Sequence, residues 1–549
     1  MHKRLLYASF GLLATLVGMA TGHLVASLLN PAASPVLAVG STVIDLTPTP
    51  MKEWAIRQFG SADKAILIGS VLLGVLVFAA IAGILARRRF ALGAGLLVVL
   101  VAVAGTAAMT RPAAEIVDLV PSILTAVAGV AALFWLDRTA KAAATVTGTT
   151  PAVGSAPDTT SKRLPHPMAS ATGSAKGESD TVSSEGPQHA LTPEPTTPTR
   201  RGVLIAMGVL AAAAAVMGGA GKLIGNLRSR PEDITLPAAA DPAAPLPKGI
   251  DNQVKGISSF VTSNSDFYRV DTRLDTPIIS ADDWTLTIDG DVDNEMTFTF
   301  DDLLGMDLIE RDITMTCVSN SVGGPYVGSA RWLGVRLQDL LDLAGVGSKS
   351  DQILSTDFEG MTISTPLDLA TDGRDAMIAI GMNGEALPRE HGFPARMIIP
   401  GLYGFISGTK WITRLTLTTY DDAKAYWTER DWDTDAPIKI SARIDTPNAL
   451  DSLPAGEVVI GGVAWAQQKG GVDKIEVRID GGPWQPAELG PSGGNDYWRQ
   501  WFFKWDAKPG SRTVAARVIS GDGETQTATA ANPFPGGSSG IQSFLVTVE

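Results

Sequence analysis

One cysteine stands in this chain of 549 residues, at a place where a thiol could do chemistry. Cys317 lies in the run ITMTCVSNSVGG (313–324), in which an alternating strand pattern is followed by a loop of Ser, Asn and Gly. A thiol at a strand end that faces a turn stands where functional groups are commonly found. A lone cysteine is also commonly a small buried apolar side chain, so the sequence pattern leaves both interpretations open.

The composition excludes several kinds of site and partner. A single cysteine cannot form an internal disulfide, a zinc ribbon, a thiolate-held iron–sulfur cluster or a CxxCH haem attachment. The histidines are few and scattered: His2, His23, His166, His189 and His391. The formal net charge of −13 argues against a general nucleic-acid-binding protein, which would present a basic face.

Strands and short helices alternate around the cysteine. Ten of the 12 tryptophans lie in this second half of the chain, which indicates a large packed core. Alternation predicts strands in TLTIDG (285–290), TFTF (297–300) and ITMT (313–316). The apolar spacing of LQDLLDLAGV (337–346) predicts a helix. We therefore expect an α+β domain over residues 251–435.

From residue 436 onwards the sequence predicts only strands and turns. Segments such as EVVIGGVAWA, KIEVRIDGG and WRQWFFKWD are separated by Gly, Pro, Asp and Asn. Short strands at this spacing predict an all-β sandwich of immunoglobulin type over residues 436–549.

The N-terminal part has the composition of a membrane region. Residues 5–29 carry no charged side chain, and at about 1.5 Å per residue they are long enough to cross ~30 Å of hydrocarbon. Similar apolar runs occupy 65–86, 90–109, 115–136 and 202–224. We expect four spans within residues 1–137 and a fifth in 202–225, although Glu115 and Asp118 weaken the fourth. A cleaved signal peptide is the alternative for the first run.

Basic residues flank these runs and predict their orientation. The clusters are His2-Lys3-Arg4, Arg87-Arg88-Arg89 and the set Arg138, Lys141, Arg200 and Arg201. By the positive-inside rule all three clusters are cytoplasmic. We therefore expect a multi-pass protein of the plasma membrane, with everything after the fifth span outside the cytoplasm.

Two segments of low complexity connect these parts. Residues 138–201 lack aromatic side chains and are crowded with Ser, Thr, Pro, Gly and Ala, which predicts a disordered cytoplasmic linker. Residues 226–250 predict a tether. Arg200 and Arg201 precede the fifth run directly, as in a twin-arginine signal, which exports folded proteins. The alternative is that these are two ordinary topology charges.

Several motifs in residues 251–549 resemble one family, the molybdenum enzymes of the sulfite oxidase type. They are FYRVD (267–271), TMTCVSN (314–320), MNGEALPREHGFPARMIIPGLYG (382–404), TKWITRL (409–415), GVAWAQQKGGVDKIEVRIDGGPWQPAEL (462–489) and WRQWFFKWD (498–506). The resemblance implies a molybdopterin-binding domain followed by the family's immunoglobulin-like dimerisation domain. It does not include the membrane segments.

The resemblance also implies roles for individual residues. Cys317 would give its thiolate to molybdenum, a soft ligand beside the dithiolene sulfurs of the pterin. Charged and amide donors would bind the pterin phosphate. The implied cofactor-binding residues are Asn264, Tyr268, Arg269, Asp357, His391, Arg396, Gly408, Thr409 and Lys410.

Departures from the family concern the substrate. The sequence AIGMNG has Ile380 and Gly381 where sulfite oxidases have a tyrosine close by, and the CVSNSVGG loop lacks their arginine pair. A dianion would meet little positive charge, so we expect oxygen-atom transfer in the direction of reducing a sulfoxide or N-oxide. The oxidised substrate is expected to be a small molecule or protein-bound, as in protein methionine sulfoxide. Sulfite oxidation is the alternative.

Electrons must come from a separate partner. His23 is the only histidine in the predicted spans, so these spans cannot hold a bis-histidine haem. We expect a membrane cytochrome, a quinone-linked protein or a soluble carrier, and the family resemblance also points to a homodimer. A non-catalytic binding scaffold is the competing function. A transporter fits poorly, because the spans show no repeat and few charges.

Overall fold

The computed structural model describes residues 2–48, 51, 54, 58–59, 63–111, 114–146, 200–228 and 234–549. Most of the predicted linker 138–201 and part of the predicted tether 226–250 therefore lie outside the described residues. The chain divides into two compact units. One consists of residues 1–21, 73–100 and 124–217, and the other consists of residues 22–72, 101–123 and 218–549.

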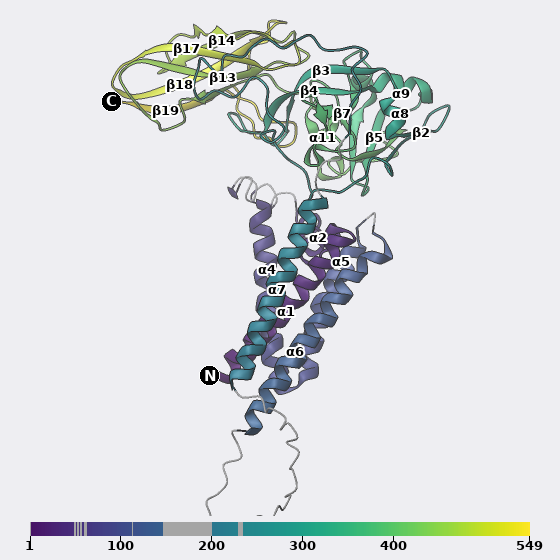
Figure 1. Cartoon of the computed structure of the whole chain (residues 1–549). Coiled ribbons are helices and arrows are strands. Elements are labelled where there is room, and N and C mark those ends of the chain that lie inside the picture. The colour runs from purple at the N-terminus through teal and green to yellow at the C-terminus, as the bar shows by residue number, and fades with distance from the viewer. Residues whose placement is uncertain are drawn as a thin grey trace, which may run out of the picture. The chain divides into compact units, whose positions relative to one another are not determined.

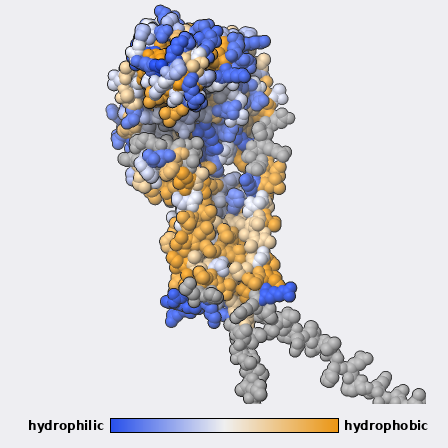
Figure 2. Space-filling model, turned by 90° about the vertical axis from the view of Figure 1, so that its left-hand side faces the viewer, coloured by the Kyte–Doolittle hydropathy of each residue, from blue (hydrophilic) through white to orange (hydrophobic). Residues whose placement is uncertain are grey.

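Among the described residues, five helices are long and apolar enough to cross a membrane, as the sequence predicts. The helices are α1 (His2–Leu28), α4 (Asp63–Arg88), α5 (Phe90–Met109), α6 (Val120–Val146) and α7 (Arg200–Arg228). A shorter apolar helix, α2 (Pro35–Leu46), follows α1. Figure 2 shows that apolar side chains dominate the visible surface of these helices, which is typical of helices that face lipid.

The first unit packs by close backbone contact and one buried polar cluster. A Cβ atom at Gly11 of α1 would lie 1.9 Å from the carbonyl oxygen of Ala79 in α4, so only glycine fits there. The Tyr7 hydroxyl donates to Asp137 Oδ1 over 3.0 Å, and Lys141 Nζ donates to Asp137 Oδ2 over 2.6 Å. These contacts connect α1 with α4 and α6.

Two sheets form the α+β part of the second unit (Figure 1). The first has the order β2-β1-β10-β5-β6. Its strands are β1 (Thr285–Gly290), β2 (Met296–Thr299), β5 (Gln352–Asp357), β6 (Thr362–Pro366) and β10 (Ile412–Thr418). The second has the order β3-β4-β7-β8, with β9 paired to β7. Its strands are β3 (Leu308–Thr316), β4 (Val327–Arg336), β7 (Met377–Met382), β8 (Glu385–Ala386) and β9 (Arg396–Ile398).

Short helices connect these strands where the sequence supplies their end signals. Helix α8 (Phe300–Leu304) begins with a capping box between Thr299 and Asp302. Helix α9 (Leu337–Ala344) buries its leucines and ends at Gly345, whose φ of +71° is left-handed. The other short helices are η4 (Arg389–His391), α10 (Leu367–Ala370), α11 (Gly404–Ser407) and η5 (Thr428–Arg430). The predicted strands and the predicted helix are therefore confirmed.

The C-terminal part is a β-sandwich, as predicted. Its sheets have the orders β11-β13-β17-β16 and β12-β19-β18-β14-β15. The long strands are β11 (Ser441–Thr446), β13 (Gly456–Trp465), β14 (Val472–Ile479), β17 (Arg499–Ala507), β18 (Gly510–Ser520) and β19 (Gln542–Val548). The short edge strands are β12 (Ser452–Leu453), β15 (Gln485–Pro486) and β16 (Glu488–Leu489). Alternate side chains from both sheets form one core, with Ile460, Val477 and Trp501 fully buried.

Candidate functional site

Cys317 follows the last residue of β3 and begins the loop to β4. Its side chain is buried, and Sγ lies 3.0 Å from the Ser319 hydroxyl. Burial raises the pKa of the Cys317 thiol, while the Ser319 hydroxyl and the nearby Lys410 charge act in the opposite direction. A positive metal ion at Sγ would therefore have to displace the proton, which a soft metal does readily.

The loop after Cys317 is held by its own backbone and by the sandwich. Asn320 N–H donates to the Cys317 carbonyl over 3.0 Å, which closes a turn. From the sandwich, Ser538 Oγ donates to the Asn320 carbonyl over 2.6 Å, and Arg443 Nη1 donates to the Gly324 carbonyl over 3.2 Å. Residues far apart in the sequence thus fix the position of the thiol.

Two buried cations, Lys410 and Arg396, lie next to each other on a β-bridge. Burial lowers the pKa of Lys410 to about 8 and that of Arg396 to about 10. Arg396 donates to the carbonyl groups of His391 and Gly408, but its buried Nε has no partner among the described residues. An unpaired buried guanidinium donor beside a buried ammonium group suits an anionic ligand such as a phosphate.

His391 bonds to Arg396 through its carbonyl and to Asn264 through its ring. His391 Nε2 lies 2.8 Å from the Asn264 carbonyl, and the imidazole is 2% exposed. Burial lowers the pKa of His391 to about 4, so the ring is neutral at pH 7 and donates through Nε2. Asn383, at the turn after β7, donates from Nδ2 to Asn264 Oδ1 over 2.9 Å. The structure thus brings together residues from two segments that the resemblance implied separately.

Tyr268 and Arg269 extend the site from the segment before β1. Burial, together with the nearby Cys317, raises the pKa of Tyr268 well above its ordinary value, so the phenol stays protonated. Arg269 Nε donates to Asp271 over 2.8 Å, and Lys410 Nζ donates to the same carboxylate over 2.7 Å. Asp271 is therefore the anion around which these basic side chains gather.

The remaining predicted residues differ in how directly they belong to the site. Gly408 and Thr409 lie beside Arg396 and Lys410, and the buried Thr409 hydroxyl is 2.5 Å from Ser355 Oγ. Asp357 instead pairs with Arg273 and accepts backbone hydrogen bonds from Glu359 and Met361 of its own loop.

Two charged residues of the site went unrecognised in the sequence. Asp271 ends the FYRVD motif, and Arg273 follows two positions later. Arg273 pairs with Asp357 and Glu359 and lies over the rings of Phe358 and Trp411, at 4.5 and 5.4 Å from their centroids. The alternation of opposite charges in RVDTR is the signal that could have indicated them.

The structure also bears on the departures from the family pattern. Ile380 is fully buried in the apolar core, and Gly381 packs against Leu236. Neither residue therefore presents an exposed surface to a substrate. Arg331 is distant in the sequence from Cys317 but could bring positive charge to an anionic substrate. Its guanidinium pairs with Asp312 and Glu310. Its charge is therefore balanced within β3 and β4.

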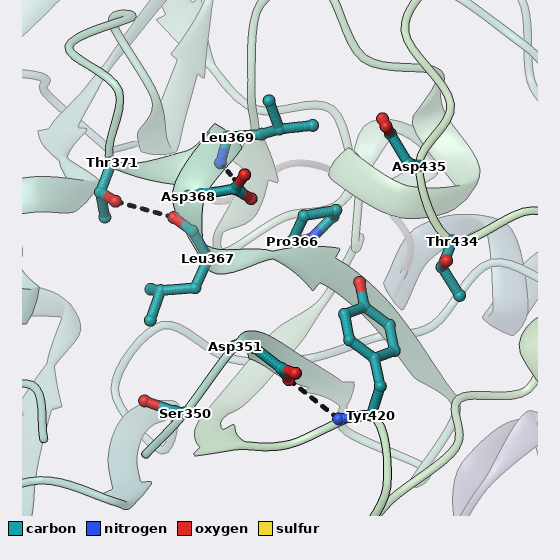
Figure 3. A pocket seen from close by; sticks show the side chains of 10 residues that line it. All are labelled: Ser350, Asp351, Pro366, Leu367, Asp368, Leu369, Thr371, Tyr420, Thr434 and Asp435. Atoms are coloured by element: carbon teal, nitrogen blue, oxygen red, sulfur yellow. Dashed lines mark hydrogen bonds between the residues drawn. The ribbon is translucent and has the colours of Figure 1, made fainter. Parts of the chain in front are cut away.

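A separate cavity of about 580 Å³ lies elsewhere in the α+β part (Figure 3). It is lined by Ser350, Asp351, Pro366, Leu367, Asp368, Leu369, Thr371, Tyr420, Thr434 and Asp435. The lining contains three carboxylates and no basic side chain, so it does not suit a phosphate-bearing cofactor. None of the predicted site residues lines it.

A cofactor that carries both a soft metal and a phosphate fits the described residues. Cys317 offers a thiol, and Lys410 and Arg396 offer buried positive charge with an unpaired donor. Within the described residues there is no group of three or more His, Cys, Asp or Glu that could hold a metal without help. A cofactor that brings further metal ligands of its own would fit beside Cys317.

Comparisons with known proteins agree on the α+β part. Residues 273–427 match the model of the oxidoreductase molybdopterin-binding domain. Mitochondrial sulfite oxidase of Rattus norvegicus is 30% identical over 274 residues, which covers 42% of this chain and 50% of that protein. Nitrate reductase [NADH] 2 of Nicotiana tabacum is 31% identical over 281 residues, covering 40% of this chain and 30% of that protein.

A solved structure, the sulfane dehydrogenase SoxCD from Paracoccus pantotrophus, is 23% identical with a TM-score of 0.46 and covers 53% of this chain and 84% of that chain. The chain spans about half the length of the sulfite oxidases that it matches.

Proposed function

Because this chain belongs to the sulfite oxidase family of molybdopterin-dependent oxidoreductases, we propose that it transfers oxygen atoms at a molybdenum centre held by Cys317. The observation that supports this most is the buried Cys317 thiol in the same site as Lys410 and Arg396, two buried cations suited to a phosphate. When bound, the molybdopterin cofactor would supply the two-electron chemistry of oxygen-atom transfer.

The chain's own residues would bind and orient the cofactor. Lys410 and the free Nε of Arg396 would hold the pterin phosphate, together with the backbone at Gly408 and Thr409. Neutral His391 donates to Asn264, which leaves its Nδ1 free to accept a hydrogen bond from the pterin. Tyr268 and Arg269 would contact the cofactor from the other side, and Asp357 would act through Arg273.

We propose a neutral oxidised compound, a sulfoxide or an N-oxide, as the substrate. The loop after Cys317 offers Ser319, Asn320 and Ser321 as polar groups without charge. Arg269 and Arg331 are already paired with carboxylates, and Arg443 is paired with Asp445. Desolvating a dianion such as sulfite there would cost more free energy than desolvating a neutral dipole.

Steady-state kinetics on the purified full-length protein test the substrate. Reduced viologen dyes would supply electrons for a panel of sulfoxides and N-oxides, and an artificial acceptor would serve for sulfite. We expect kcat/KM for at least one sulfoxide or N-oxide to exceed that for sulfite by about 100-fold, equivalent to ~2.7 kcal/mol. A kcat/KM for sulfite above every oxidised compound would assign the protein to sulfite oxidation.

Metal and pterin analysis separates an enzyme from a binding scaffold. We expect one molybdenum and one molybdopterin per chain in protein made by a host that synthesises the cofactor. Protein without molybdenum, produced in the same host and correctly folded, would support a scaffold that kept the fold for binding alone.

We further propose that the catalytic part lies outside the cytoplasm of a multi-pass plasma-membrane protein. The basic flanks of the five spans support this orientation. Arg200 and Arg201 at the start of α7 would serve as a twin-arginine signal that exports the folded, loaded domain. Electrons would then come from a membrane cytochrome, a quinone-linked protein or a soluble carrier, and the sandwich would join two copies.

A further inference from the structure

The second compact unit includes residues 22–72, 101–123 and 218–549, so it contains the start of α4, the end of α5 and the whole α+β part. Lys64 lies in the first turn of α4, and Arg111 lies just after α5. Both cations bond to residues of the α+β part. Lys64 bonds directly to residues 269–275, which we call the cofactor segment, and Arg111 bonds to Glu359, which pairs with Arg273 of that segment.

Lys64 bonds to the cofactor segment at two places. Its Nζ donates to Asp271 Oδ1 over 3.1 Å and to the Arg273 carbonyl over 2.7 Å. The Asp271 side chain is 7% exposed and also accepts from Arg269 and Lys410, two predicted cofactor-binding residues. Burial alone would raise the pKa of Asp271, but Lys410, Lys64 and Arg269 hold it far below its ordinary value.

Arg111 reaches the same segment through one intermediate. Its Nη2 donates to Glu359 Oε1 over 3.1 Å, and Glu359 also pairs with Arg273. All three side chains are at most 14% exposed, so water competes little for these bonds. The fixed Arg273 then contacts Trp411, the residue after Lys410.

We propose that Lys64 and Arg111 are positioning residues that hold the cofactor segment, so that the helical region orders the molybdopterin site as well as anchoring the protein. Each side chain acts through Asp271 or Arg273 and not by contact with the cofactor. The consequence for cofactor binding rests on the proposed function, whereas the consequence for the segment itself does not.

Hydrogen exchange on full-length protein without cofactor tests the segment directly. The variants are Lys64→Ala and Arg111→Ala, with Lys64→Arg and Arg111→Lys as conservative partners. Lys222→Ala is the matched control, because Lys222 is an exposed lysine near the end of α7 that takes no part in the ion pairs of the cofactor segment described above. Lys64 is 33% exposed, so its replacement is compatible with folding.

We expect backbone amides of residues 267–275, such as the Arg273 amide that donates to Asp271 over 3.0 Å, to exchange at least about fivefold faster in both alanine variants. The conservative variants should restore slow exchange. Amides of β17 should be unaffected in every variant, which shows that the fold is intact. Exchange in Lys64→Ala and Arg111→Ala equal to that in Lys222→Ala would overturn the proposal.

Cofactor retention provides the second measurement. In protein loaded with molybdopterin, we expect the alanine variants to lose the pterin at least about fivefold faster than Lys222→Ala and to show a changed Mo(V) electron paramagnetic resonance spectrum. Equal rates and spectra would contradict the link to the cofactor. Wild-type protein without molybdenum would refute the proposed function, while the exchange experiment would still decide the positioning role.

Discussion

The Cys317 side chain experiences two opposing influences. Burial favours the neutral thiol, and the Ser319 hydroxyl and Lys410 favour the thiolate. In the chain alone the neutral thiol is therefore favoured, which protects this cysteine from ready oxidation. A cation bound at Sγ would favour the thiolate, which is the behaviour expected of a metal ligand.

Replacing this thiol tests its role. In Cys317→Ser the loop should keep its fold, because its position depends on backbone hydrogen bonds and on Ser538. An alkoxide is a much poorer ligand for a soft metal, so we expect kcat to fall by more than about 100-fold. Ser319→Ala keeps the Cys317 thiolate, so we expect its kcat to fall by less than about tenfold. Near-normal turnover by Cys317→Ser would exclude the cysteine as a ligand.

His391 predicts a pH dependence of stability. Its pKa is about 4 in the folded protein and 6.5 when unperturbed, so between these values the unfolded chain takes up a proton that the folded chain does not. Stability should therefore fall as the pH drops through this window. Between pH 7.5 and 5 we expect a loss of about 2 kcal/mol.

Urea unfolding, followed by tryptophan fluorescence at a series of pH values, measures this loss. His391→Gln keeps a donor toward Asn264 but cannot titrate. Between pH 7.5 and 5 its free energy of unfolding should therefore fall by about 2 kcal/mol less than that of the wild type. Identical pH profiles for wild type and His391→Gln would show that the imidazole is not buried in its neutral form.

Among the elements, α1 and α4 show how tightly the helices pack. Because a Cβ at Gly11 would collide with the Ala79 carbonyl, we expect Gly11→Ala to destabilise the helical unit by about 1–3 kcal/mol. Thermal unfolding of the detergent-solubilised protein measures this. Gly74→Ala in α4 is the control, since nothing lies within 4 Å of a Cβ there. Equal melting temperatures for the two variants would mean that α1 and α4 do not touch at Gly11.

Local elements could be predicted from the sequence because their signals are local. The alternation in 285–290 gave β1, and the leucine spacing followed by Gly345 gave α9. Cys317 was expected at a strand end and follows Thr316, the last residue of β3. The ion pairs of Asp271 and Arg273 could not be predicted, because their partners Lys64 and Glu359 are distant in the sequence and surface-type residues by composition.

At the scale of the whole molecule, the motifs predicted the order of the parts. The family resemblance predicted that Lys410, Arg396 and His391 belong to one cofactor site. It could not predict how the sandwich holds the Cys317 loop. Ser538 and Arg443 bond to backbone carbonyls, which every residue type has, so the sequence of the loop does not indicate these bonds. Contacts to the backbone constrain position without constraining the partner's residue type.

Export of the whole molecule is tested at the start of α7. If Arg200 and Arg201 form a twin-arginine signal, replacing both by lysine should leave the catalytic part in the cytoplasm, because such receptors distinguish guanidinium from ammonium groups. Protease protection in spheroplasts measures its location. The control variant replaces Arg87 and Arg88 by lysine, which keeps the positive charge at the end of α4. Normal export of the variant with lysine at both positions would show that Arg200 and Arg201 only set the orientation of the span.

The hydrogen bond from Ser538 to the Asn320 carbonyl also sets an order of events during biosynthesis. A ribosome makes the Cys317 loop long before it adds Ser538 near the end of the chain. Until then the loop lacks one of the hydrogen bonds that hold it, and the position of the Cys317 thiol is less tightly fixed. We therefore expect molybdenum to be inserted only after Ser538 has been synthesised and the sandwich has folded against the loop.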